Sequence, residues 1–275
     1  MSLAWGLVIL VVADAIAIGA MLLVRRRAPE GSFFTDGDRA SGVFGVLATG
    51  FSIFAGFVIF LAFTSYDASR SGAESEALVV EQQFETAQFM PAEIRDRLSG
   101  ELVCYARYVV EQSWPRMRAG TLGDALNPWS VALFHSLRNV EPKTAAEQAA
   151  YGKWLDQTTD REEARRDRVH GATGITPTPL WIVLFLTAGI LFAYMLFFAD
   201  SGERAKSQAM LMGSAVTVVV ATLLAIHALD NPYRAGVGSI QPVAMERALR
   251  ILSEERAAVK DRAQVPCDEN GAPTS

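Results

Sequence analysis

The chain has 275 residues, of which 51% are hydrophobic, and its mean hydropathy is +0.20. Its formal net charge is -5, and no basic stripe interleaved with aromatic residues occurs, so we expect no nucleic-acid partner. The apolar residues are concentrated in a few long runs. This distribution argues against a soluble domain and indicates a protein whose first partner is the lipid bilayer.

Four apolar runs are long enough to cross the roughly 30 Å hydrocarbon core of a bilayer as helices. They cover residues 3–24, 43–63, 179–199 and 210–229. Only Asp14 in the first run and His227 in the fourth add a charged or ionisable group of the Asp, Glu, Lys, Arg or His type. A cleaved signal peptide has its basic residues before the apolar core, whereas here Arg25 follows it. The first run is therefore predicted to be an uncleaved span.

Lys and Arg in short loops tend to remain in the cytoplasm. The two short connections between spans hold six such residues, namely Arg25, Arg26, Arg27, Arg39, Arg204 and Lys206. Arg70 and Arg165 lie beside spans on the other side, so the difference in charge is small. The rule predicts a multi-pass membrane protein with the two short connections in the cytoplasm, and with both termini and the long segment 64–178 on the other side of the membrane.

The second span is predicted to continue as one helix of about 70 Å, because no proline occurs between Val43 and Met90. Gly72 is the one weak point of that helix. Pro91 is expected in the first turn of the next helix. Apolar residues at three- and four-residue spacing mark the buried face of this helix. They are Ile94, Leu98, Leu102, Tyr105 and Val109.

Three further helices are expected outside the membrane. Asn127 as N-cap and Pro128 at N1 begin a short helix. A polar helix follows at about 142–169, and a last one lies near 242–262. No alternating strand pattern occurs, so the predicted fold class is all-α: an integral membrane protein with four transmembrane helices and a helical extramembrane layer between spans two and three.

This pattern divides the chain into five parts. They are transmembrane helices 1 and 2 (1–63), a helical extramembrane domain (64–178), transmembrane helices 3 and 4 (179–229), a C-terminal motif with a helix (230–262) and a disordered tail (263–275). Cys104 and Cys267 do not have the spacing of metal ligands. They can form a disulfide only if both face an oxidising compartment, and two free thiols are the alternative.

Asp14 lies near the centre of the first span. A carboxylate at this depth costs about 2.5–3.5 kcal/mol on insertion scales and usually faces a bundle interior or a wet path. One interpretation is an ion or proton site, or a ring of carboxylates in an oligomer. The other is a protonated Asp that forms a hydrogen bond with a Ser or Thr of another span.

The second span carries a stripe of small residues at helical spacing, which allows close approach of helices. The stripe comprises Ser41, Gly45, Ala48, Ser52, Ala55 and Ala62. Bulky residues on another side, among them Ile53, Phe57 and Phe60, either form a hydrophobic constriction in a channel or meet lipid. Asp67 lies just past the span. If a pore opens there, its charge could help to select ions; the alternative is an ordinary charged residue at a membrane surface. Ser52 and Asp67 are thus further candidates for an ion path.

No catalytic constellation occurs in the sequence. There is no nucleophile motif, no phosphate-binding glycine loop and no zinc-protease motif. His135, His170 and His227 are isolated from one another, so we predict no metal site and no cofactor. An enzyme is the least favoured class.

Three stretches carry a family resemblance. In the first, "SYDASRSGAESEALVVEQQFETAQFMP", a Tyr, then acidic residues, then a proline that opens a helix follow the exit of the second span. The other two lie farther along the chain. "LSGELVCYARYVVEQSWPRMRAG" contains Tyr105, Val109, Glu111, Trp114 and Pro115, and "ALDNPYRAGVGSIQP" contains Asp230, Pro232, Tyr233, Gly236, Ile240 and Pro242. Their order around four spans resembles the bestrophin-like membrane proteins of bacteria, a family described as a domain of unknown function. The resemblance extends from the first span to about residue 252.

The resemblance implies a homo-oligomer of the bacterial inner membrane that conducts inorganic ions, with a pentamer expected by analogy. In that membrane the charge rule places the segment 64–178 in the periplasm. Bestrophins are pentameric anion channels in which the second span lines the pore and apolar residues narrow it, which would make Ile53, Phe57 and Phe60 constriction residues. The eukaryotic channels have an acidic Ca²⁺-binding run after the fourth span, but residues 234–237 contain no acid, which argues against Ca²⁺ gating. Bestrophins also keep the large helical part in the cytoplasm, opposite to the prediction from charge.

Two classes of function therefore stay open. One is an oligomeric ion channel with an axial path lined by the second span. The other is a non-conducting scaffold or sensor that binds a protein partner through residues 92–168. A third, weaker hypothesis is proton- or cation-coupled transport through Asp14.

Overall fold

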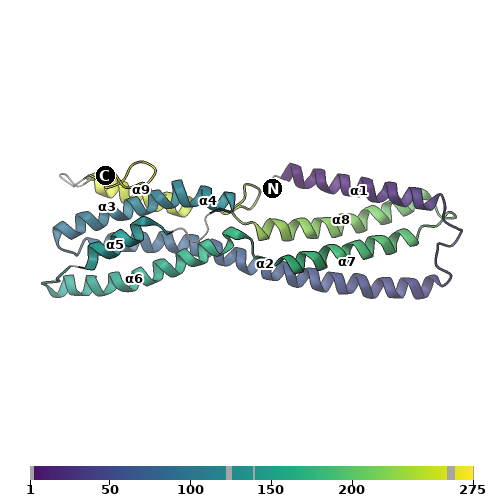
Figure 1. Ribbon diagram of the computed structural model, residues 1–275, viewed down its shortest axis with the longest axis horizontal. Helices are drawn as coiled ribbons and strands as arrows, with labels where there is room; N and C mark the ends of the chain where they lie inside the picture. Colours follow the sequence, from purple (N-terminus) through teal and green to yellow (C-terminus); the bar gives the residue numbers. More distant parts are fainter. Residues whose placement is uncertain (1–2, 122–125, 139, 259–263, 275) are drawn as a thin grey trace. The chain divides into compact units, whose positions relative to one another are not determined.

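The computed structural model describes residues 3–121, 126–138, 140–258 and 264–274, and in these ranges every regular element is a helix (Figure 1). The longer helices are α1 Leu3–Arg25, α2 Gly37–Ala87, α3 Ala92–Tyr108, α5 Pro128–Arg138, α6 Ala145–His170, α7 Thr178–Phe197, α8 Ala205–Asp230 and α9 Val243–Ala258. Short elements are the π-helix η1 Val109–Ser113, α4 Trp114–Ala119 and the 3₁₀ turn η2 Gly171–Thr173. The all-α prediction is confirmed.

The chain forms two compact units, and α2 contributes to both. The membrane unit comprises Met1–Thr64, Ile175–Asn231 and Ala235–Val237. The helical unit comprises Ser65–Gly174, Pro232–Arg234 and Gly238–Ser275. The four predicted spans correspond to α1, α2, α7 and α8, each long and apolar enough to cross a membrane.

The helices of the membrane unit bury few of their side chains. Helix α2 packs Phe51, Ala55 and Val58 against Leu184 of α7 and Ile226 of α8. Helix α1 lies along α8 (Figure 1). The long apolar helices therefore leave most of their surface for lipid or for other chains.

The helical unit has a core of its own. The predicted face residues Leu98, Leu102 and Tyr105 of α3 are buried in it, as is Val109 at the start of η1, whereas Ile94 is only partly buried. Pro91 is the N-cap of α3 and not a first-turn residue, because its backbone is extended (φ -51°, ψ 143°).

The other predicted helix ends differ from the structure by a few residues. Asn127 accepts a hydrogen bond from the Trp129 N–H at 3.0 Å, as expected for a cap of α5. Helix α6 begins at Ala145, later than predicted, because Thr144 and Glu147 form a capping box. The predicted continuation of the last helix over residues 259–262 lies outside the described residues.

Gly72 is a point of close approach between α2 and α6. A Cβ atom there would lie 2.5 Å from the Arg168 nitrogen and 2.8 Å from the Ala164 oxygen. The residue predicted to weaken α2 thus allows the backbone of α6 to contact it.

Cys104 and Cys267 form a disulfide that attaches the C-terminal segment to α3. Over residues 264–274 the prediction of a disordered tail is wrong, while residues 263 and 275 lie outside the described ranges. Trp129 donates its indole N–H to the Gly271 carbonyl at 2.7 Å, and Asp268 accepts from the Ala272 N–H at 2.8 Å. A short polar segment is ordered by this covalent bond and these local turns, which hydrophobic patterning does not reveal.

Candidate functional site

A buried ion pair lies in the core of the helical unit. Glu76 of α2 and Arg168 of α6 form two hydrogen bonds, one of them Nη2 to Oε1 at 3.1 Å, and neither side chain is more than 1% exposed. Tyr105 of α3 donates its hydroxyl to Glu76 Oε1 at 2.5 Å. One carboxylate therefore joins three helices, and its desolvation is offset by charge-assisted bonds.

A second buried guanidinium extends this network. Arg161 of α6 lies over the ring of Tyr105, 4.9 Å from its centroid, and donates to Gln83 Oε1 at 2.7 Å. Gln83 in turn donates to the Thr158 hydroxyl at 3.1 Å. The face that α6 presents to the core therefore includes polar and charged side chains beside apolar ones.

The segment after α8 is joined to the same network. Tyr233 donates its hydroxyl to the Arg168 carbonyl at 2.5 Å, and its ring meets Trp114 edge to face at 5.6 Å. The guanidinium of Arg168 lies 5.5 Å from the Trp114 ring centroid. The Trp114 indole donates to the Ile240 carbonyl at 3.3 Å.

These contacts fix the protonation states of the network. Desolvation, and then the charge of Glu76, raise the pKa of Tyr105 well above its ordinary value. Desolvation also raises the pKa of Tyr233, so both phenols stay neutral donors. Burial lowers the pKa of Arg168, but Glu76 outweighs it and the pKa lies above the ordinary value. Arg168 therefore stays charged at physiological pH.

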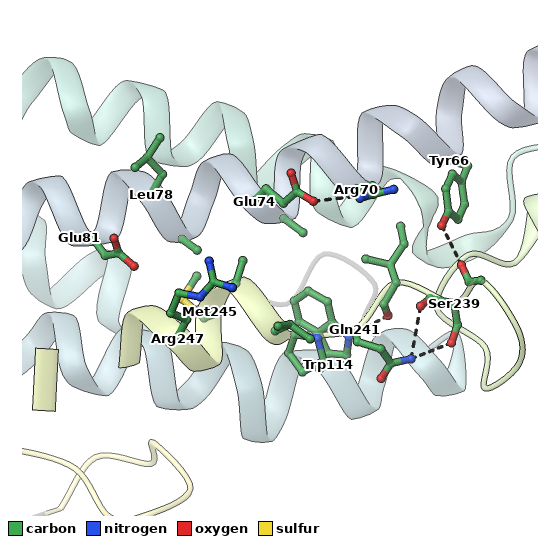
Figure 2. A pocket seen from close by; sticks show the side chains of 17 residues that line it. Tyr66, Arg70, Glu74, Leu78, Glu81, Trp114, Ser239, Gln241, Met245 and Arg247 are labelled. Atoms are coloured by element: carbon green, nitrogen blue, oxygen red, sulfur yellow. Dashed lines mark hydrogen bonds and ion pairs between the residues drawn. The ribbon is translucent and has the colours of Figure 1, made fainter. Parts of the chain in front are cut away.

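A groove of about 670 Å³ lies beside the network within the helical unit. One wall is a stripe of α2 and the other is the segment 238–247 at the start of α9, with Trp114 between them (Figure 2). Tyr66 donates its hydroxyl to the Gly238 carbonyl at 2.7 Å, which fixes one end of the groove.

The charged side chains of the groove are of both signs. Arg70 pairs with Glu74 at 3.2 Å, and Glu81 and Arg247 extend from the two walls (Figure 2). No group of three His, Cys, Asp or Glu side chains suited to a metal occurs within the described ranges. The groove is thus amphipathic, without a single-sign charge that would select one kind of ion.

The remaining motif residues shape the backbone. Asp230 accepts from the Ile175 and Thr176 N–H groups at 2.8 and 2.6 Å, within the membrane unit. Pro115 is in the first turn of α4, and the Pro232 carbonyl accepts from Ile240 at 2.8 Å. Gly236 is exposed.

The model of the bestrophin-like domain matches residues 11–245 of the chain. The chain belongs to the bestrophin-like family. No curated protein matches it.

Crystal structures of a bacterial bestrophin homologue from Klebsiella pneumoniae share the fold. One of them, phased by Zn-SAD, is 15% identical, with a TM-score of 0.67 over 93% of this chain and 99% of the other. A point variant of the homologue is also 15% identical, with a TM-score of 0.65 over 92% and 98% of the two chains. Identity this low shows the fold alone.

In this bestrophin-like chain the predicted constriction residues lie on the exposed side of α2. Ile53, Phe57 and Phe60 are 70%, 60% and 61% exposed, and Ser52 and Asp67 are exposed as well. Ser52 donates to the Ala48 carbonyl of its own helix at 2.9 Å. The structure thus groups the three apolar residues on a free face.

Asp14 contacts another span of the bestrophin-like fold. Its Oδ2 accepts from the Thr217 hydroxyl of α8 at 2.7 Å. Its Oδ1 is buried without a hydrogen-bond partner among the described residues. Thr217 supplies the Ser or Thr hydroxyl of another span that the second interpretation of Asp14, a hydrogen bond between spans, requires.

Residue spacing in the sequence did not predict that Glu76, Arg161 and Arg168 are core residues. A signal was present in α6, because Trp154, Gln157, Arg161, Ala164 and Arg168 recur at spacings of three and four residues and are all buried. In a sequence, arginines at this spacing are more typical of a helix face that is exposed to solvent than of a buried one. Its partner Glu76 lies on another helix, 92 residues away, and spacing cannot indicate it.

Proposed function

We propose that this bestrophin-like protein is a homo-oligomeric channel for inorganic ions, with an axial path lined by α2. The observation that carries the proposal is the two-sided character of α2 in the membrane. Phe51, Ala55 and Val58 pack against α7 and α8, while Ile53 and Phe57 are left open. Around an axis, the open face of each copy would form an apolar ring, the kind of constriction that gates by dewetting.

Purified protein in planar bilayers tests the proposal. Conductance is expected, and Phe57→Ala should increase the open probability because it widens the ring. Phe185→Ala is the matched control, since Phe185 is an equally exposed phenylalanine of α7 and should leave the currents unchanged. A well-folded oligomer that stays silent, or equal effects of the two variants, would contradict the channel proposal. Images of the particle give the subunit number, for which a pentamer is expected from the family.

We further propose that the helical unit faces the periplasm of a bacterial cell. Disulfides persist in oxidising compartments, and both Cys104 and Cys267 belong to this unit. The six basic residues of the short connections support the same orientation. Both arguments oppose the cytoplasmic placement that the likeness to bestrophins implies.

Thiol labelling distinguishes the two orientations. In a Cys104→Ala, Cys267→Ala background, a membrane-impermeant maleimide applied to spheroplasts should modify Asp156→Cys of α6 and leave Glu30→Cys unmodified. Both positions are exposed. The reverse pattern would place the helical unit in the cytoplasm.

A scaffold that binds a protein partner is the second candidate. Within residues 92–168 the exposed apolar side chains include Leu126, Val131, Phe134 and Leu155. A contiguous patch of such side chains would mark a binding surface. One stoichiometric partner that is recovered with the native protein and lost with Phe134→Asp would support this function.

A further inference from the structure

The end of α1 forms a pocket that combines two arginines with apolar walls. The pocket has a volume of about 540 Å³ and is lined by Leu23, Val24, Arg26, Arg27 and Phe33. Leu23 and Phe33 are 64% and 41% exposed. Phe33 is held in place by a hydrogen bond from its N–H to the Phe197 carbonyl at 3.2 Å and by the contact of the two rings. The apolar wall is thus built into the fold.

Arg26 and Arg27 form no ion pair with a carboxylate among the described residues. Their neighbour Arg25 is used differently, because it donates to the Ser201 carbonyl at 3.0 Å and to the Glu203 carbonyl. These bonds fasten the end of α1 to the connection between α7 and α8. For the guanidinium groups of Arg26 and Arg27, the described part of the chain supplies no such acceptor.

Two acids of the connection between α7 and α8 accept hydrogen bonds from groups other than Arg26 and Arg27. Asp200 accepts from the Gly202 N–H at 2.7 Å and the Gly31 N–H at 3.0 Å, and these bonds lower its pKa below the ordinary value. Glu203 accepts from the Gln208 side chain at 3.1 Å. Among the described residues, the two guanidinium groups of the pocket therefore have no carboxylate in ion-pair contact.

We propose that this pocket binds the phosphate of an anionic phospholipid. Arg26 and Arg27 would hold the phosphate, since guanidinium forks match its oxygens. The acyl chains would lie along Leu23 and Phe33, at the level where α1 ends its apolar run. A zwitterionic lipid adds a positive headgroup to the same place, and a free phosphate gains nothing from the apolar wall. The inference does not depend on conduction or on the orientation of the chain.

Titrations of the delipidated full-length protein in micelles test this site. The probes are dioctanoyl phosphatidylglycerol, dioctanoyl phosphatidylcholine and inorganic phosphate, and bound lipid is counted by native mass spectrometry. Phosphatidylglycerol should bind most tightly. The double variant Arg26→Gln, Arg27→Gln should weaken it about thirtyfold, from about 1 kcal/mol per arginine near a membrane surface.

The matched control is the double variant Arg204→Gln, Lys206→Gln, which removes two cations at the start of α8, the N-cap Arg204 and the first-turn Lys206, outside the pocket. It should retain most of the affinity. An equal loss in both double variants would show a diffuse field and overturn the site. Phosphatidylcholine or inorganic phosphate binding as tightly as phosphatidylglycerol would overturn the choice of ligand. Circular dichroism and gel filtration establish that all variants are folded.

Discussion

The two units of this chain solve the problem of a buried carboxylate in different ways. In the helical unit, Glu76 is bonded to Arg168 and Tyr105, and both its oxygens have partners. In the membrane unit, Asp14 has one partner, the Thr217 hydroxyl, and its second oxygen has none among the described residues. One carboxylate is the centre of a charged network and the other forms a single hydrogen bond.

The difference between the two carboxylates follows from the medium that surrounds each unit, which is water for the helical unit and lipid for the membrane unit. Water drives the helical unit to bury apolar surface, and the large core that results can also enclose a fully bonded ion pair. Lipid gives no such drive, so the spans associate through packing and a few hydrogen bonds. We therefore expect charge changes to be costly in the helical unit and mild at Asp14.

The largest effect is expected from Glu76→Gln. The variant leaves Arg168 buried without a counter-charge, which should lower the free energy of unfolding by about 3–5 kcal/mol. Urea titration in micelles, followed by the fluorescence of the buried Trp114 and Trp154, measures it. Glu74→Gln is the matched control on the same helix, because Glu74 pairs with Arg70 in an exposed i,i+4 arrangement. The control should change stability by less than about 0.5 kcal/mol, and similar losses for the two would refute the network.

The next effect is expected from Gly72→Ala. Its Cβ would lie 2.5 Å from the Arg168 nitrogen, so α2 and α6 must separate, at a cost of about 1–3 kcal/mol. Gly152→Ala of α6 is the control, because nothing lies within 4 Å of its Cβ position. This control should raise stability by up to about 1 kcal/mol, from helix propensity. A neutral Gly72→Ala would mean that the two helices do not approach closely.

The spans and the buried face of α3 were predictable, because membrane length and helical spacing are local properties of a sequence. Residues 264–274 were not, since a disulfide between positions 163 residues apart and an indole bond to Gly271 order a segment of polar composition. The motif residues Trp114 and Tyr233 were singled out by resemblance, but their shared contact with Arg168 depends on how α6 packs. Residue spacing along the chain thus did not predict the contacts between segments that are distant in the sequence.

Asp14→Leu should have a smaller effect than either change in the helical unit. It removes the bond to Thr217 between α1 and α8, and such bonds contribute about 0.6 kcal/mol on average in membranes, at most about 1.7. Asp14→Asn keeps an acceptor oxygen and should leave assembly and conductance unchanged. Thermal unfolding of the oligomer and bilayer currents measure both variants. Loss of flux in a correctly assembled Asp14→Asn protein would instead favour the transport hypothesis.

The smallest expected effect is on the pH dependence of stability, and it comes from Glu101, a buried acid of α3. Desolvation raises its pKa above the ordinary value of 4.5, although the Ser136 hydroxyl, which donates at 2.7 Å, and Arg97 oppose this shift. The folded state therefore binds the proton more tightly than the unfolded state. This contribution to stability is complete below pH 4.5 and is lost as the pH rises through the raised value.

Glu101→Gln should remove this part of the pH dependence, while Glu93→Gln at an exposed position should keep it. Melting temperatures from pH 4.5 to 8 measure the slopes, and parallel curves for native protein and Glu101→Gln would show that the buried carboxyl does not titrate differently on folding.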